Sequence, residues 1–186
     1  ATLLKTAEAI LKKAEQPQHE MFGFQLKVMA LESLGQLGDE KAAARLKKEI
    51  AEAKKSDDPQ MAELAWQMYV GSLLRSWPEL SGQEKDALRE ELIAQVKADG
   101  ASPFDVSLVR GAASELSDYD SEFARALLEA SLPIFRESDD QSVVDAASRL
   151  EGLSRRLNLP GNELEISGEL LSGGQVDWES YRGKVV

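Results

Sequence analysis

The chain contains no cysteine and only one histidine, His19, among its 186 residues. Without cysteine, these residues can form no disulfide, no thiolate nucleophile and no cysteine-ligated zinc site. His19 stands beside Gln18 and Glu20, where a helix is expected to begin, and no second histidine could share a metal ion with it. We therefore expect His19 to be exposed, and we predict no catalytic residue, no metal site and no cofactor in this chain.

Aromatic residues are scarce as well, at 6%, and no window approaches the roughly 18 uninterrupted apolar residues of a membrane span. Basic residues are outnumbered, 22 against 33 acidic ones, so the net charge is −11. A domain that binds duplex nucleic acid carries a basic face to replace phosphate counterions. This balance argues against a nucleic-acid partner and favours a soluble protein whose dispersed acids face solvent.

What the chain does have is the composition of a helical protein, with 42% hydrophobic and 30% charged residues. Apolar residues recur at helical spacing from residue 1 to about 157. We predict an all-α fold of about eight antiparallel helices joined by short polar turns. The predicted helix starts each carry capping residues or an early proline: Asp39, Ser56, Asp57 and Asp58 before Pro59, Ser81 with Glu84, Ser102 with Pro103 and Asp105, Asp118 or Asp120, and Asp139 or Asp140.

Two arrangements of these helices remain open. Asp-containing turns that precede Ala-rich helices resemble those of tetratricopeptide-type arrays, but no steady 34-residue period is present. The alternatives are an irregular bundle and a tetratricopeptide-like stack of helical hairpins.

Two features of the helical region could be mistaken for, or could form, functional sites. Residues 118–122 place oxygens at alternate positions like a calcium loop, but Phe123 occupies the position that requires glycine, so helix capping explains them better. Trp66, Tyr69 and Trp77 form the most aromatic-rich stretch. We expect these rings to be core residues, with a partner-binding surface as the alternative.

The pattern changes after residue 157. Helical periodicity gives way to alternation around glycine-rich turns, which predicts a short β-hairpin. We therefore divide the chain into a helical domain, 1–157, and a tail, 158–186. The hairpin prediction depends on these residues: Leu164, Ile166, Gly173, Gly174, Val176 and Trp178.

The tail contains LPG at 159–161, EISG at 165–168, two glycines at 173–174 and RGKVV at 182–186. In this order they resemble the start of the thioredoxin-like domain in bacterial thiol–disulfide oxidoreductases of the TlpA/ResA redoxin group. The resemblance implies that Gly183, Lys184, Val185 and Val186 lead into a strand that delivers a CxxC motif about ten residues further on. In that family the motif lies at a helix N-terminus, which lowers the thiol pKa.

By this resemblance, residues 1–157 are the non-catalytic helical domain of an extracytoplasmic oxidoreductase, periplasmic or in the cell envelope, cut off before its cysteines. The helices would offer a surface to a protein partner or substrate, or restrict access to the dithiol. The alternative is a helical-repeat interaction scaffold unrelated to redox chemistry. Left open are the partner, the oligomeric state, any membrane anchor, and a reductase, oxidase or peroxidase role.

A tail without its partner sheet predicts a specific protease sensitivity, because a short hairpin alone is marginally stable. Limited proteolysis should cut between residues 160 and 175 before it cuts any helix, as judged by mass spectrometry of the first fragments. Cleavage of the helices and the tail at equal rates would contradict this expectation.

Overall fold

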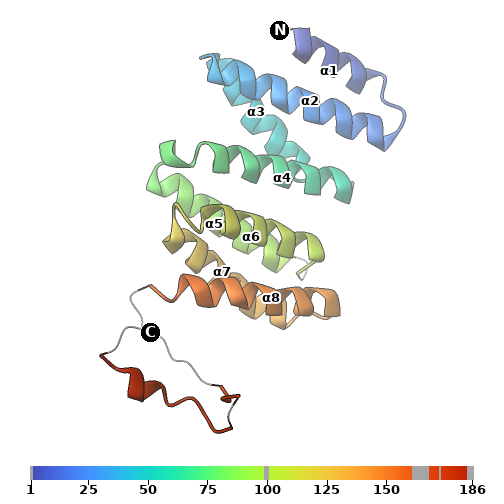
Figure 1. The fold of residues 1–186 in the computed structure, drawn as a ribbon. Coiled ribbons are helices and arrows are strands. Elements are labelled where there is room, and N and C mark those ends of the chain that lie inside the picture. The colour runs from blue at the N-terminus through green and yellow to red at the C-terminus, as the bar shows by residue number, and fades with distance from the viewer. Residues whose placement is uncertain (1, 99–100, 161–167, 172, 184–186) are drawn as a thin grey trace.

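The computed structural model describes residues 2–98, 101–160, 168–171 and 173–183. Within them the fold is all-α, as predicted, with eight α-helices and two short 3-10 helices (Figure 1). In chain order the elements are α1 (Thr2–Lys12), α2 (Pro17–Gln36), α3 (Glu40–Ala53), α4 (Pro59–Arg75), η1 (Trp77–Glu79), α5 (Gly82–Ala98), α6 (Pro103–Leu116), α7 (Ser121–Arg136), α8 (Gln141–Leu157) and η2 (Trp178–Tyr181).

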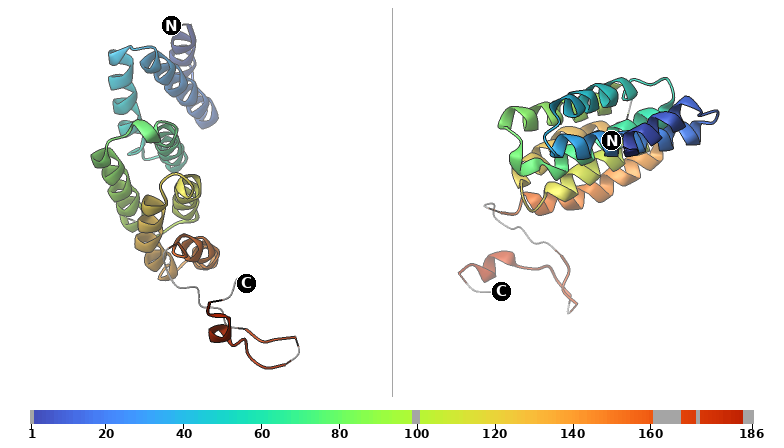
Figure 2. Two further views of the ribbon diagram at one scale, coloured as in Figure 1. Left: turned by 60° about the vertical axis from the view of Figure 1, so that its left-hand side comes forward. Right: turned by 90° about the horizontal axis from the view of Figure 1, so that it is seen from above.

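The helices form an extended stack in two layers, which Figure 2 shows from the side. Helices α2, α4, α6 and α8 lie side by side in one layer, and each packs on the next. Helices α3, α5 and α7 form the second layer, and α1 packs on α2 at one end. The first-layer helices begin at residues 17, 59, 103 and 141, a spacing of about forty residues that exceeds the tetratricopeptide period. Because consecutive helices pack side by side in these two layers, the arrangement is a stack of helical hairpins.

Local chemistry explains where the helices begin. Proline occupies the first turn of α2, α4 and α6, where its missing N–H costs no hydrogen bond. Asp39 accepts a hydrogen bond from the backbone N–H of Ala42, and Ser102 forms a full capping box with Asp105. These predicted caps are confirmed. Of the pairs left open, Asp120 caps α7 and Asp140 caps α8.

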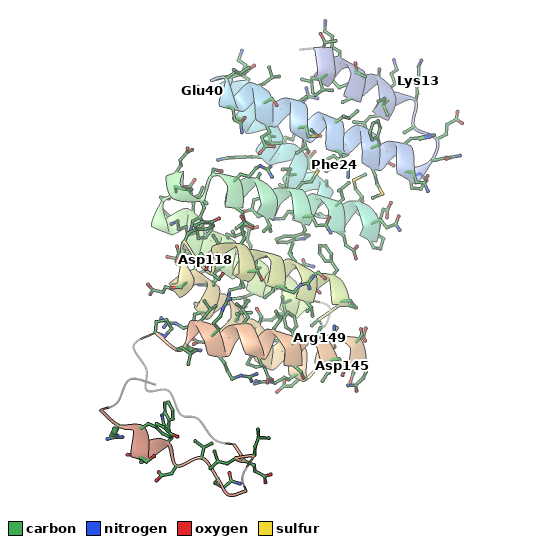
Figure 3. The ribbon with its side chains drawn as sticks, viewed as in Figure 1. Lys13, Phe24, Glu40, Asp118, Asp145 and Arg149 are labelled. Atoms are coloured by element: carbon green, nitrogen blue, oxygen red, sulfur yellow. The ribbon has the colours of Figure 1, made fainter. Side chains whose placement is uncertain are left out.

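The interior is divided into two hydrophobic clusters. The smaller one lies among α2, α3 and α4 and centres on Phe24, Val28 and Ile50 (Figure 3 labels Phe24). The larger one extends from α4 to α8 and includes Trp66 and Phe135. Helix α4 supplies buried residues to both clusters and thereby joins the two halves of the stack.

The predicted β-hairpin is not shown by the structure. Gly173 and Gly174 form a tight turn at φ values of 84° and 94°, which favour glycine, and one antiparallel bridge joins Glu169 to Gln175. No strand is present among the described residues, and the expected strand residue Trp178 instead begins η2. The strand prediction for Trp178 was wrong because Asp177 caps a helical turn, accepting a hydrogen bond from the backbone N–H of Ser180. The expected strand residues Leu164 and Ile166 lie outside the described residues.

The described part of the tail contributes nothing to either core. Helix α8 ends at Leu157, close to the predicted domain boundary. None of the described residues from 168 to 183 is buried, and Leu170 and Leu171 are both exposed. The stability of the helical stack therefore depends on residues of the eight helices.

One prediction concerns Asp120, which connects three elements. Its carboxylate accepts hydrogen bonds from the backbone N–H of Phe123 at 3.1 Å, from Trp77 Nε1 at 3.2 Å and from Lys85 Nζ at 3.4 Å. Asp120→Ala removes a helix cap and leaves the N–H of a buried tryptophan unpaired, so we expect a loss of about 2 kcal/mol in the free energy of unfolding. Urea denaturation measures it.

Asp140→Ala is the matched control. Asp140 caps α8 from an exposed position, and its carboxylate accepts hydrogen bonds from the backbone N–H and the hydroxyl of Ser142, so this change should cost about 1 kcal/mol. Equal losses in the two variants would show that the bonds to Trp77 and Lys85 contribute nothing.

Candidate functional site

The described residues contain no group of three or more His, Cys, Asp or Glu side chains that could hold a metal ion. None of the helices in this part of the chain is long and apolar enough to cross a membrane. His19 is exposed in the first turn of α2, as expected. In the calcium-like segment, Asp118 is exposed in the turn after α6 (Figure 3) and Asp120 is a helix cap.

The three aromatic residues proposed as a partner surface are mainly core residues. Trp66 and Trp77 are only 7% and 4% exposed, and Trp77 packs edge-on against Phe123 with 4.7 Å between ring centroids. Tyr69 is half-buried and lies edge-to-face with Trp66. These rings are therefore core residues, because their apolar faces are already covered by the chain itself.

Trp66 and Tyr69 bind a cation that belongs to the chain. The ammonium group of Lys54, just after α3, lies 3.8 Å from the centroid of the Trp66 ring and 3.9 Å from that of Tyr69. Glu91 of α5 pairs with the same ammonium group and accepts a hydrogen bond from the Tyr69 hydroxyl at 3.2 Å. Burial and the charge of Glu91 raise the pKa of Tyr69 to about 12. These four residues, Lys54, Trp66, Tyr69 and Glu91, form what we call the Lys54 box. It links α3, α4 and α5, and its role is structural.

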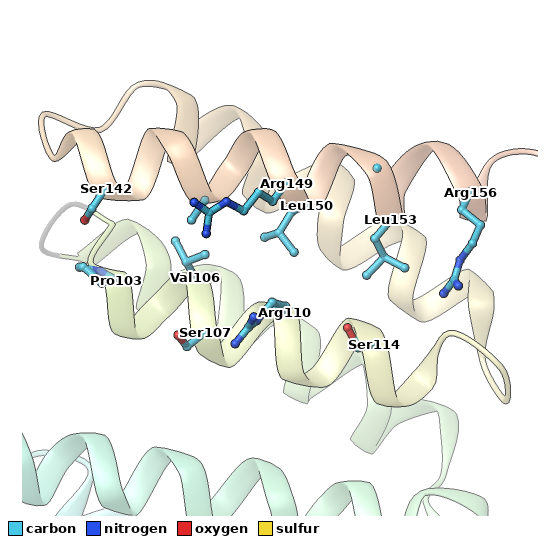
Figure 4. A pocket seen from close by; sticks show the side chains of 12 residues that line it. Pro103, Val106, Ser107, Arg110, Ser114, Ser142, Arg149, Leu150, Leu153 and Arg156 are labelled. Atoms are coloured by element: carbon cyan, nitrogen blue, oxygen red, sulfur yellow. The ribbon is translucent and has the colours of Figure 1, made fainter.

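The candidate functional site is a groove of about 560 Å³ between α6 and α8 (Figure 4). Both helices lie in the same layer, and each turns one face toward the groove. The residues of each face recur three or four positions apart, which places them along one side of a helix. The lining consists of Pro103, Val106, Ser107, Arg110 and Ser114 from α6, with Ser142, Ala146, Arg149, Leu150, Gly152, Leu153 and Arg156 from α8.

The groove has an apolar floor and a polar rim. Val106 and Leu150 are buried between the two helices, and Ala146 and Leu153 are half-buried beside them. These contacts hold α6 against α8 and fix the width of the groove. Gly152 leaves the rim open, because a Cβ atom at this position would meet nothing within 4 Å.

Three arginines, Arg110, Arg149 and Arg156, extend from the two helices along the groove (Figure 4). All three are exposed, and none forms an ion pair or hydrogen bond with another described residue. Neighbouring arginines differ: Arg136 and Arg155 both pair with Glu151. No aspartate or glutamate is among the described residues that line the groove, although acids outnumber bases in the chain. The groove is therefore a positive site on a negative protein.

Sequence reasoning missed this groove. Arg149 and Arg156 stand seven residues apart and so share one face of α8, with Gly152 between them, and this spacing was the available signal. Arg110 belongs to a helix that starts 38 residues before α8, and only the packing of α6 on α8 brings its side chain to the same groove.

The residues predicted to lead into a redox motif are described only in part. Gly183 has a φ of 78°, which favours glycine, and the preceding Arg182 pairs with Glu179. Lys184, Val185 and Val186 lie outside the described residues. Comparisons of the chain with family models, with curated proteins and with solved structures found no match.

The Lys54 box predicts a particular pH dependence of stability. Above pH 10, the ordinary value for tyrosine, the unfolded chain loses the Tyr69 proton while the folded chain retains it up to about pH 12. The stability that the neutral hydroxyl confers is complete below pH 10 and is lost as pH rises toward 12. The difference in free energy of unfolding between the natural chain and Tyr69→Phe should therefore shrink from pH 9 to pH 11 in urea titrations. A constant difference would contradict the burial of this hydroxyl beside Glu91.

Proposed function

We propose that the helical stack is a protein-binding domain that accompanies a thioredoxin-like thiol–disulfide oxidoreductase domain and takes no part in the chemistry itself. The groove between α6 and α8 carries the binding part of this proposal. The redox part rests on the resemblance of residues 159–186 to redoxin proteins. The same resemblance implies an extracytoplasmic location.

The form of the stack supports a binding role. Helical hairpins packed in a row expose long, continuous faces, and proteins built this way commonly use such faces to bind other proteins. Here one face has a groove with buried Val106 and Leu150 at its floor and, at its rim, three arginines that have no ion pair with any described residue. Apolar contact area beside charged groups is the usual composition of a protein-recognition surface.

The backbone conformation of three glycines in the tail supports the redox part of the proposal. Gly173, Gly174 and Gly183 belong to the segments that resemble the redoxin group, and each adopts a positive φ that favours glycine. The chain has no cysteine, so the thiols of such an oxidoreductase would belong to a CxxC motif encoded beyond Val186. In the proposal, Gly183, Lys184, Val185 and Val186 lead into that motif.

A second candidate function is an interaction scaffold with no redox partner domain. The groove favours it directly, since every lining residue belongs to α6 or α8 and none to the described part of the tail. The two candidates share the binding role and differ only in the residues encoded beyond Val186.

The coding sequence beyond the codon for Val186 tests the redox part. We expect an open frame that encodes CxxC about ten residues further on, because the tail would place it at the end of the next strand. The purified full-length protein should then catalyse the reduction of insulin disulfides by dithiothreitol in a turbidity assay, and the cysteine-free chain of residues 1–186 is the control without activity. A stop codon, or a continuation without paired cysteines, would overturn the redox part and leave the scaffold function.

A further inference from the structure

We infer that the groove between α6 and α8 binds an acidic peptide segment of a partner protein, one with apolar side chains between its carboxylates. This inference rests on the proposed binding role of the helical stack and not on its redox part. It is carried by the charge, length and floor of the groove.

Charge complementarity defines the ligand as an anion. Arg110, Arg149 and Arg156 have no counterion among the described residues. The nearest acid on the same face of α8, Asp145, accepts a hydrogen bond from Gln141 instead, and Glu151 is occupied by two other arginines. Guanidinium groups bind carboxylates through paired N–H donors, so an acidic segment would supply the partners that the chain does not.

The length of the groove defines the ligand as a chain rather than a small ion. Arg149 and Arg156 are two helical turns apart, or about 10 Å along α8. One phosphate or carboxylate group cannot bind both, whereas two acidic residues three positions apart in a peptide of polyproline II conformation would, because such residues share one face about 9 Å apart. From Ser142 to Arg156 the lining extends about 21 Å, enough for about six extended residues.

The floor distinguishes a peptide from a nucleic acid. Val106, Ala146, Leu150 and Leu153 form an aliphatic surface between the arginines, which suits the apolar side chains of a peptide. Single-stranded nucleic acid is bound by stacking its bases on aromatic rings, and no aromatic side chain is among the described residues that line the groove.

Two exposed serines complete the rim. The hydroxyl groups of Ser107 and Ser114 of α6 have no hydrogen-bond partner among the described residues, so they can bond to the backbone of an extended peptide. The open space in front of Gly152 leaves room for that backbone on the α8 side. The groove therefore offers contacts to the side chains and to the main chain of the same ligand.

Fluorescence anisotropy with two peptides and the full chain of residues 1–186 tests the inference. The first probe is a fluorescein-labelled peptide with glutamate at every third position and leucine or alanine between, and the second replaces each glutamate by glutamine. We expect the acidic probe to bind at least about tenfold more tightly, and added salt to weaken only that binding, because ions screen charged contacts. Equal affinity of the two probes, or no binding of either, would overturn the inference.

Charge variants locate the binding. Arg149→Gln, and separately Arg110→Gln, should weaken binding of the acidic probe about three- to tenfold, the value of one exposed charged contact. Arg125→Gln is the matched control, since Arg125 of α7 also has no ion pair in the described part of the chain but lies outside the groove. An equal loss in the control would show that the probe responds to net charge alone and would overturn the inference.

A pair of glycine variants tests the groove itself. Gly152 in α8 and Gly111 in α6 are both exposed, and a Cβ at either would meet nothing within 4 Å, so a larger side chain starts from open space at each position. Only Gly152 lines the groove. Gly152→Trp should reduce the affinity at least about tenfold, because its ring fills the peptide's place, while Gly111→Trp should leave it unchanged. Circular dichroism confirms that both variants remain folded, and equal affinities would overturn the inference.

Two competitors separate the ligand classes. Inorganic phosphate at the salt-matched ionic strength and a labelled oligouridylate should both fail to displace the acidic probe. Displacement by either would show a general anion site and overturn the peptide assignment. The redox part of the proposed function is tested separately, by whether a CxxC motif is encoded downstream. Peptide binding by a protein that lacks this motif would overturn the redox part and leave this inference intact.

Discussion

The structure depends on helix α4 having apolar residues on more than one side. This helix places Met61, Leu64 and Ala65 in one hydrophobic cluster and Trp66 in the other. Lys54 closes the junction, because its ammonium group lies against the Trp66 and Tyr69 rings and pairs with Glu91 of α5. A helix that joins two cores in this way makes eight helices one continuous stack.

The binding groove is a consequence of this stacking. Helices of one layer pack through small and aliphatic residues, as α6 and α8 do through Val106 and Leu150, and the residues next to that seam remain at the surface. On α6 and α8 those residues are arginines and serines, and acids are missing. Neither helix holds the site alone, so the packing that stabilises the stack also creates the surface that we propose binds a partner.

The sequence predicted what local chemistry determines. Caps such as Asp39 and the Ser102–Asp105 box were identified from spacing alone, because a cap involves residues only three apart. Features that depend on distant contacts were not predictable. Asp120 rather than Asp118 caps α7, and Asp120 also accepts a hydrogen bond from the distant Trp77. The groove forms only because Arg110 of α6 lies beside α8. Likewise, Trp178 had a strand-like pattern, but the cap provided by Asp177 began a helical turn.

The central claim is that the helical stack recognises an acidic partner segment through the groove between α6 and α8. The most direct measurement is an NMR spectrum of the arginine Nε–Hε groups during titration with an acidic peptide. The account predicts that the signals of Arg110, Arg149 and Arg156 shift together and saturate together, while those of Arg125 and the ion-paired Arg45 stay in place. Shifts spread over all arginines, or confined to those outside the groove, would contradict the account.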